Sequence, residues 1–285
     1  MSSHQLKLRL APWALLAVSA GWGLAFVLMK DAIERQSVAN FLFDRFTVAV
    51  IAMALIRPRV FRAINRDVLV RGGGAGLFLG GGYLLQTMGL ERTGAAVTGF
   101  ITGLYVVATP LLAALILKER ISKLTQFCVF LATVGLALLS IHGWSVGIGE
   151  LYVLGSAFAF GAHIIALSVW SPGRDVYAMT LIQLTTCALL SSIFVANEGF
   201  IAPPDAEVWW VIIFTAVFCT AIAFIVQTWS QAHISATKVA VILTMEVVFA
   251  ALFAVIFGGE RLTLQVLLGG ILVIIAMYII VIKES

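Results

Sequence analysis

The feature that most constrains this chain is a series of long apolar runs, each of about 20 residues, separated by short segments that carry most of the charge. An α-helix of about 20 apolar residues spans the hydrocarbon core of a bilayer. The chain is 61% hydrophobic and only 11% charged, which is more apolar surface than a soluble domain can bury. Because the runs are continuous and not alternating, we predict an all-α membrane protein and not a β-barrel.

The runs predict ten membrane-spanning helices, joined by connections too short to form a separate domain. Their expected bounds are 11–30, 38–56, 68–90, 94–117, 123–141, 148–169, 177–196, 207–230, 236–257 and 262–282. The segments on the side of the N-terminus hold 13 lysines and arginines and the opposite segments hold 4, while Arg45 lies inside a span. Since basic residues concentrate on the cytoplasmic side, we predict a multi-pass protein of the cell inner (plasma) membrane with both termini cytoplasmic.

The chain also contains an internal repeat. At an offset of 141 residues, segment 83–121 aligns without a gap with segment 224–262, and 10 of 39 positions are identical. The polar identities are the informative ones: Gln86-Thr87 with Gln227-Thr228, and Glu119-Arg120 with Glu260-Arg261. We therefore predict two five-helix repeats, 1–145 and 146–285. Because five is odd, the second repeat enters the membrane from the opposite side, which is the inverted topology common among secondary transporters.

The order and spacing of several residues support a family resemblance. They are the Trp22-Gly23 pair in the first helix, Arg45 in the second, Pro110 in the fourth, and the Glu-Arg pairs that end the fourth and ninth helices. Over its whole length the chain resembles the EamA family of the drug/metabolite transporter superfamily, and within it the YddG-type amino acid exporters. The second half departs from the pattern at Ala251 and at Phe160-Gly161. The resemblance implies ten helices as two inverted repeats, and export of small organic metabolites such as aromatic or other neutral amino acids by alternating access.

Glu246 is the most informative single residue, because it lies about halfway along the ninth predicted helix. A charge at the centre of the bilayer costs ~2.5–3.5 kcal/mol on insertion scales, so the side chain requires a wet cavity, a partner or a proton. We interpret Glu246 as a substrate or proton site; a neutral carboxyl that bonds between helices is the alternative. Its repeat mate, Tyr105, is also mid-helix.

Five further residues complete the expected substrate site. Trp22 and Tyr83 offer aromatic faces for stacking or cation–π contact. Gln86 and Gln227 are repeat mates, and inverted topology would place them at the two mouths of a central cavity. His163 lies within the sixth helix. For each of these residues ordinary packing or hydrogen bonding between helices is the alternative interpretation.

The sequence indicates no enzyme, because it contains no Walker sequence, no HExxH motif and no histidine pair at ligand spacing. We expect no catalytic residues, no metal and no cofactor. The expected partners are a small-molecule substrate and the lipid bilayer, with protons as a further candidate, no nucleic acid, and a monomeric state. Polyanions such as sugar phosphates fit poorly, since no arginine or lysine is expected at mid-depth. Asp44 and Arg45 open the second predicted helix, and a structural bond or a headgroup contact is the favoured interpretation of both. Transport of nucleosides, drugs or sugars remains an alternative, followed by a membrane scaffold or an intramembrane enzyme.

Overall fold

The computed structural model describes residues 3–283 apart from 91, 93–94, 119, 141–146 and 258–262. Every regular element in this part of the chain is helical. The first half contains α1 (Ser3–Arg35), α2 (Val38–Ile56), η1 (Pro58–Ala63), α3 (Arg66–Leu90), α4 (Ala95–Gly103), α5 (Tyr105–Leu112), η2 (Ala113–Leu117) and α6 (Lys123–Ser140). The second half contains α7 (Ile148–Trp170), α8 (Val176–Glu198), α9 (Ala206–Ala216), η3 (Val217–Ile222), α10 (Ala223–Gln231), α11 (Ala236–Leu243), α12 (Met245–Phe257) and α13 (Leu264–Lys283). The Glu-Arg pairs of the repeat lie partly outside the described residues, because Glu119, Glu260 and Arg261 belong to the gaps.

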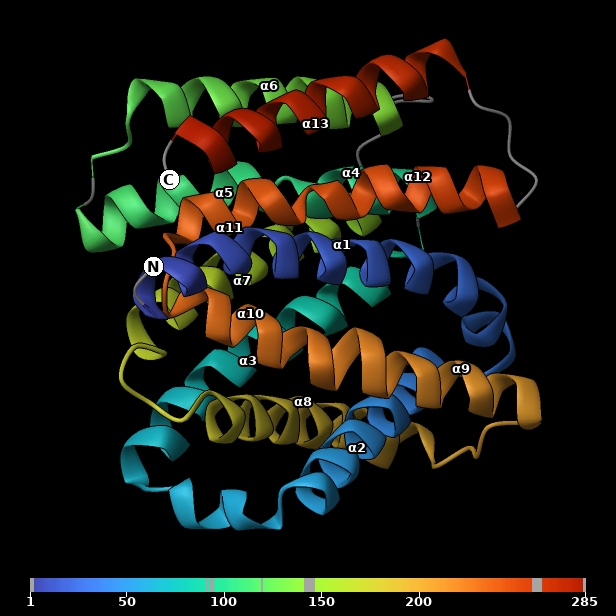
Figure 1. Cartoon of the computed structure of the whole chain (residues 1–285). Coiled ribbons are helices and arrows are strands. Elements are labelled where there is room, and N and C mark those ends of the chain that lie inside the picture. Colours follow the sequence, from blue (N-terminus) through green and yellow to red (C-terminus); the bar gives the residue numbers. More distant parts are fainter. Residues whose placement is uncertain are drawn as a thin grey trace.

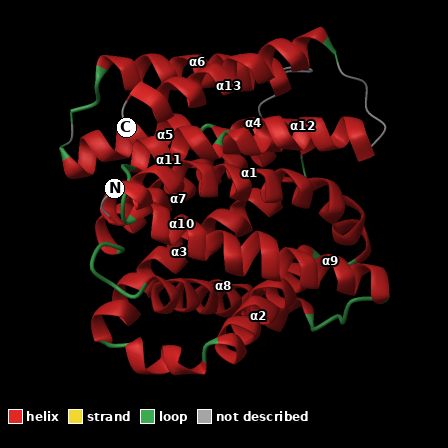
Figure 2. Ribbon diagram, viewed as in Figure 1, coloured by secondary structure: helices red, strands yellow, loops and turns green. Residues whose placement is uncertain are grey.

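The helices lie side by side in stacked layers (Figure 1). One outer layer is formed by α6 and α13, and the opposite outer layer by α2 and α8. Helices of both halves alternate between them, since α3 packs on α7 and α8, and α1 packs on α12. The connections are short and the ribbon is helical almost throughout (Figure 2). The two halves of the sequence are therefore interleaved in one bundle.

Seven of the described helices are long and apolar enough to cross a membrane. They are Arg9–Met29, Val38–Ile56, Arg66–Leu90, Ile148–Trp170, Val176–Glu198, Ala206–Gln231 and Ala236–Phe257. The other three predicted spans contain shorter apolar stretches in the described part of the chain: Ile101–Leu117, Lys123–Gly135 and Leu267–Ala276. The all-helical class with multiple membrane-spanning segments is thus confirmed.

Three of the predicted spans are interrupted helices. The pair α4–α5 breaks at Leu104 and the pair α11–α12 breaks at Thr244. In both breaks a backbone hydrogen bond spans three residues, from Val107 N to Leu104 O (2.9 Å) and from Val247 N to Thr244 O (3.1 Å). The third, α9–α10, contains the π-helical turn η3. Such irregular backbone is tolerated at membrane depth only where protein or a water-filled cavity surrounds it, so these turns point to the functional interior.

Two apolar cores build the bundle. One is formed by residues of α1, α5, α7 and α11 with α6 and α13, and the other by residues of α2, α3, α8 and α10. Trp22 and Phe160 pack against both cores, so they lie at the boundary between them.

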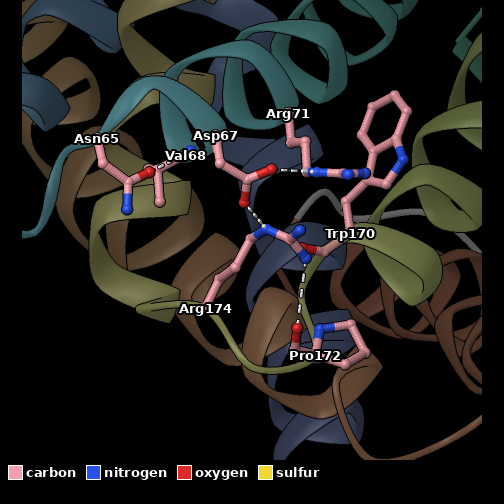
Figure 3. A network of polar contacts seen from close by, with 7 residues as sticks. All are labelled: Asn65, Asp67, Val68, Arg71, Trp170, Pro172 and Arg174. Carbon is pink, nitrogen blue, oxygen red and sulfur yellow. Dashed lines mark hydrogen bonds and ion pairs between the residues drawn. The ribbon is translucent and has the colours of Figure 1, made fainter.

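A polar network joins the start of α3 to the connection between α7 and α8 (Figure 3). Asp67 at the start of α3 accepts hydrogen bonds from Arg71 Nε (2.6 Å) and from Arg174 Nε (2.5 Å) in the α7–α8 connection. Arg57 at the end of α2 forms an ion pair of 2.9 Å with Asp175. Burial raises the pKa of Asp175, but its bonds to the Ala178 N–H and to Arg57 outweigh this effect and hold the pKa below its ordinary value.

A second polar cluster lies at the opposite ends of α2 and α8. Arg35 at the end of α1 pairs with Asp205 and Glu207 at the start of α9, and Ser37 donates a hydrogen bond of 3.1 Å to Glu198. Each cluster joins the first half of the chain to the second. The two clusters therefore connect the α2–α8 layer to neighbouring segments at both of its ends.

Candidate functional site

A cavity lies between the two apolar cores. It encloses about 650 Å³ that protein atoms do not fill, a figure that includes the solvent at its opening. Its lining includes all seven residues that the sequence predicted for a substrate site: Trp22, Tyr83, Gln86, Tyr105, His163, Gln227 and Glu246. The structure therefore brings together side chains from α1, α3, α5, α7, α10 and α12. Their role in binding remains a prediction.

Glu246 owes its position to a close contact between α1 and α12. A Cβ atom on Gly23 would lie 2.7 Å from Ala250 N and 2.9 Å from the Glu246 carbonyl oxygen, so only glycine permits this approach. The break at Thr244 places Glu246 in the first turn of α12. Its carboxylate forms no hydrogen bond or ion pair with any described residue, although it lines the cavity. An unpaired carboxylate at this depth is stabilised only by water, a ligand or a proton.

Two other cavity residues carry polar atoms without a partner. The Tyr105 hydroxyl and the Gln227 Oε1 are both buried and form no hydrogen bond in the described structure. Gln227 is only 2% exposed, and its Nε2 donates to Gln231 Oε1 at 3.0 Å. A buried polar atom without a partner costs about 1–3 kcal/mol, so these atoms mark places where a ligand or water stabilises the site.

Arg45 is a cavity residue that the sequence analysis did not select. The residue is 2% exposed, and its guanidinium donates from Nε to Thr220 Oγ1 at 2.7 Å. Its Nη2 lies 3.4 Å from the carbonyl oxygen of Cys219, which also accepts a 2.7 Å bond from Trp22 Nε1. Both acceptors belong to the π-helical turn η3. The irregular turn of one half thus receives hydrogen bonds from two side chains of the other half.

This position of Arg45 corrects one premise. The sequence suggested a structural bond or a lipid headgroup contact at the start of α2, and no basic residue at mid-depth. The side chain does form structural bonds, and it also lines the cavity. The expectation that polyanions fit poorly therefore loses its premise, because a guanidinium lines the cavity. The sequence signal that could have identified Arg45 as a site residue is its ionisable side chain inside an apolar run.

Aromatic rings form an apolar wall in the cavity. The Tyr83 ring lies edge-on to Phe160, with centroids 5.4 Å apart, and Trp22 lies 5.5 Å from Phe224. The Arg45 Cζ is 5.5 Å from the centroid of Tyr83, within the range of a cation–π interaction. Tilted and edge-on rings of this kind leave aromatic faces and edges for contact with a flat apolar group.

His163 and Gln86 are held by hydrogen bonds. His163 is 1% exposed and donates from Nε2 to Gln183 Oε1 at 2.8 Å. Gln86 Nε2 donates to Thr102 Oγ1 at 3.1 Å. Gln86 and Gln227 line the same cavity. Among the described residues, no group of three or more histidine, cysteine, aspartate or glutamate side chains is arranged to hold a metal ion.

Several apolar helices around a cavity with ionisable and aromatic walls are typical of a polytopic membrane protein, and such a cavity suits a transporter. The comparison with protein families agrees: the model of the EamA-like transporter family matches residues 9–141 and 147–282, and the chain belongs to that family. Membership indicates a transporter and not an enzyme.

Named relatives give the same class. An uncharacterized transporter of Archaeoglobus fulgidus is 32% identical over 272 residues, which cover 95% of this chain and 85% of the relative. The uncharacterized transporter YoaV of Bacillus subtilis is 24% identical over 91% of this chain and 92% of its own length. A solved crystal structure shares the fold at a TM-score of 0.77, with 18% identity and 95% of each chain covered.

Proposed function

We propose that this protein is a secondary transporter that exports small organic metabolites, such as aromatic or other neutral amino acids, by alternating access around the central cavity. The observation that carries the proposal is Glu246, a carboxylate without a described partner that faces a cavity between packed apolar helices. A packing residue at this depth would be expected to have a partner. The aromatic wall supports an organic substrate.

We further propose ten spans in two inverted five-helix repeats, residues 1–145 and 146–285, in the inner membrane with both termini cytoplasmic. The breaks at Leu104 and Thr244 support it, because they are 140 residues apart, within one residue of the repeat offset, and directly precede Tyr105 and Met245-Glu246. Broken helices around the binding site are typical of inverted-repeat transporters. The two family matches, 9–141 and 147–282, support the division.

The test is uptake by purified protein reconstituted into liposomes, with a panel of labelled amino acids, nucleosides, sugars and cationic drugs, with and without a pH gradient. We expect uptake of neutral amino acids, a loss of at least about tenfold in Glu246→Gln, and normal rates in Glu34→Gln, which alters an exposed glutamate outside the cavity. Normal uptake by Glu246→Gln across the panel and across pH would remove Glu246 from the site. Absence of uptake of every solute would overturn the transporter proposal itself.

A further inference from the structure

The described contacts do not use every N–H donor of the Arg45 guanidinium. A guanidinium carries five N–H donors. In the described structure three contacts use them, to Thr220 Oγ1, to the Cys219 carbonyl at 3.4 Å, and to the thioether sulfur of Met29 at 3.3 Å. A thioether is a weak acceptor, and no described acidic side chain lies within 4.0 Å of Arg45. No described carboxylate therefore bonds directly to this buried cation, although its charge acts on Glu246 at longer range, and N–H groups remain for a ligand in the cavity that Arg45 lines.

Glu246 presents the opposite deficiency. It faces the same cavity, and no described donor bonds to its carboxylate. The Gln227 Oε1 is a further acceptor without a donor. The site thus holds one cation that can bind further acceptors and one carboxylate that can bind donors, and these two side chains form no direct ion pair within 4.0 Å.

We propose that Arg45 and Glu246 recognise the two charged groups of one zwitterionic substrate. Arg45 binds the carboxylate and Glu246 binds the ammonium group. The apolar wall of Trp22, Tyr83 and Phe160 then receives the side chain of the substrate. The substrate class is an α-amino acid with an apolar or aromatic side chain. This inference rests on the proposed transport function and assigns its specificity to two named groups.

Charge balance explains why a zwitterion fits and a singly charged ligand does not. A zwitterion places an opposite charge beside each charged side chain and leaves the net charge of the filled cavity unchanged. A monocation bound at Glu246 would give the filled cavity a net positive charge, and a monoanion bound at Arg45 would give it a net negative charge. A buried charge left unpaired is strongly destabilising, so both charges of the substrate contribute to selection.

The experiment compares three ligands that differ in one charged group. Dissociation constants are measured by calorimetry on purified full-length protein for L-phenylalanine, for L-phenylalaninamide, which lacks the carboxylate, and for 3-phenylpropionate, which lacks the ammonium group. For the wild type we expect phenylalanine to bind at least about tenfold more tightly than either analogue. Arg45→Gln should abolish the preference over the amide and keep the preference over phenylpropionate. Glu246→Gln should do the reverse.

This crossed pattern separates recognition from structure. If Arg45 serves only η3, Arg45→Gln weakens all three ligands by the same factor, which would overturn the inference. Equal binding of the three ligands by the wild type would also overturn it. Arg62→Gln and Glu34→Gln, which alter exposed side chains outside the cavity, should leave every ratio unchanged.

Arg45→Lys covers the case in which Arg45→Gln does not fold. It keeps the cation but loses the fork of donors, so the preference for phenylalanine over the amide should shrink without vanishing. A preference that Arg45→Lys leaves at the wild-type value contradicts a role of the fork. The transport panel distinguishes the two proposals: uptake of nucleosides, sugars or drugs in place of amino acids would overturn the zwitterion site and leave the transporter intact.

Discussion

Replacement of Gly76 by alanine should destabilise the protein through one contact between α3 and α8. An added Cβ would lie 2.6 Å from Thr186 Cβ and 2.7 Å from the Gln183 carbonyl oxygen. Carbon atoms pack best at about 3.5–4.0 Å, so the two helices must separate by roughly 1 Å. Overpacking of this kind costs typically about 1–3 kcal/mol. The strain reaches the cavity as well, since Gln183 holds His163.

Gly81 supplies the matched control in the same helix. A Cβ at Gly81 meets no atom within 4 Å, so Gly81→Ala adds no clash. It gains up to about 1 kcal/mol of helix propensity, a gain that Gly76→Ala shares. The difference in stability between the two variants therefore isolates the contact and should be about 1–3 kcal/mol.

Thermal unfolding in one detergent at a fixed scan rate measures this difference. Because membrane proteins often unfold irreversibly, the comparison is between apparent midpoints recorded under identical conditions. At roughly 2–4 °C per kcal/mol, Gly76→Ala should unfold several degrees below Gly81→Ala. Equal midpoints would refute the packing argument, because the close approach of α3 to α8 would then have no energetic consequence.

Three other outcomes follow from the structure. Trp22→Phe removes the Nε1 hydrogen bond to the Cys219 carbonyl but keeps an aromatic ring, so thermal unfolding should show a loss of about 1 kcal/mol, and an unchanged midpoint would contradict this. Asp175→Asn keeps an N-cap side chain and removes the charge that pairs with Arg57. Because the pKa of Asp175 is lowered on folding, the charge contributes below about 1 kcal/mol to stability at neutral pH, and this contribution is lost as pH falls below about 4. Thermal unfolding should therefore show a difference between variant and wild type at neutral pH that disappears below about pH 4. Reporter fusions after residue 145 should report the periplasm and fusions after residue 285 the cytoplasm, whereas a C-terminus outside would contradict the inverted repeat.

The helical class followed from the sequence because apolar runs of membrane length admit few alternatives. The predicted span 38–56 has the same bounds as α2, since Ser37 caps its first turn and Pro58 follows its end. The breaks inside the fourth and ninth spans were not predicted. Gly103 ends α4 directly before Leu104, but the equivalent break at Thr244 has no proline or glycine beside it. Packing between distant segments helps to position that turn, as in the contact of Ser19 Oγ with the Ile242 carbonyl (3.4 Å).

The internal repeat selected candidate site residues that residue type alone would not have selected. Tyr105 was selected only because it is the repeat mate of Glu246, and both line the cavity. Gln86 and Gln227 were selected as repeat mates, and both line the same cavity. Spacing along one helix would not have related these residues, because they lie on four different helices.

The hydrogen-bond partners of Arg45 could not be predicted from the sequence. Its position inside an apolar run was visible, but what stabilises it is a threonine hydroxyl and a backbone carbonyl in η3, about 175 residues away in the chain. The Cys219 carbonyl can accept these hydrogen bonds because a π-helical turn departs from regular α-helical hydrogen bonding. No residue pattern in 217–222 predicts such a turn. The two features require each other: the turn receives donors from Arg45 and Trp22, and the guanidinium is held at the cavity by the turn. Loss of the Thr220 hydroxyl in Thr220→Val should therefore weaken binding of a carboxylate ligand through Arg45 while Glu246 still distinguishes ligands by their ammonium group.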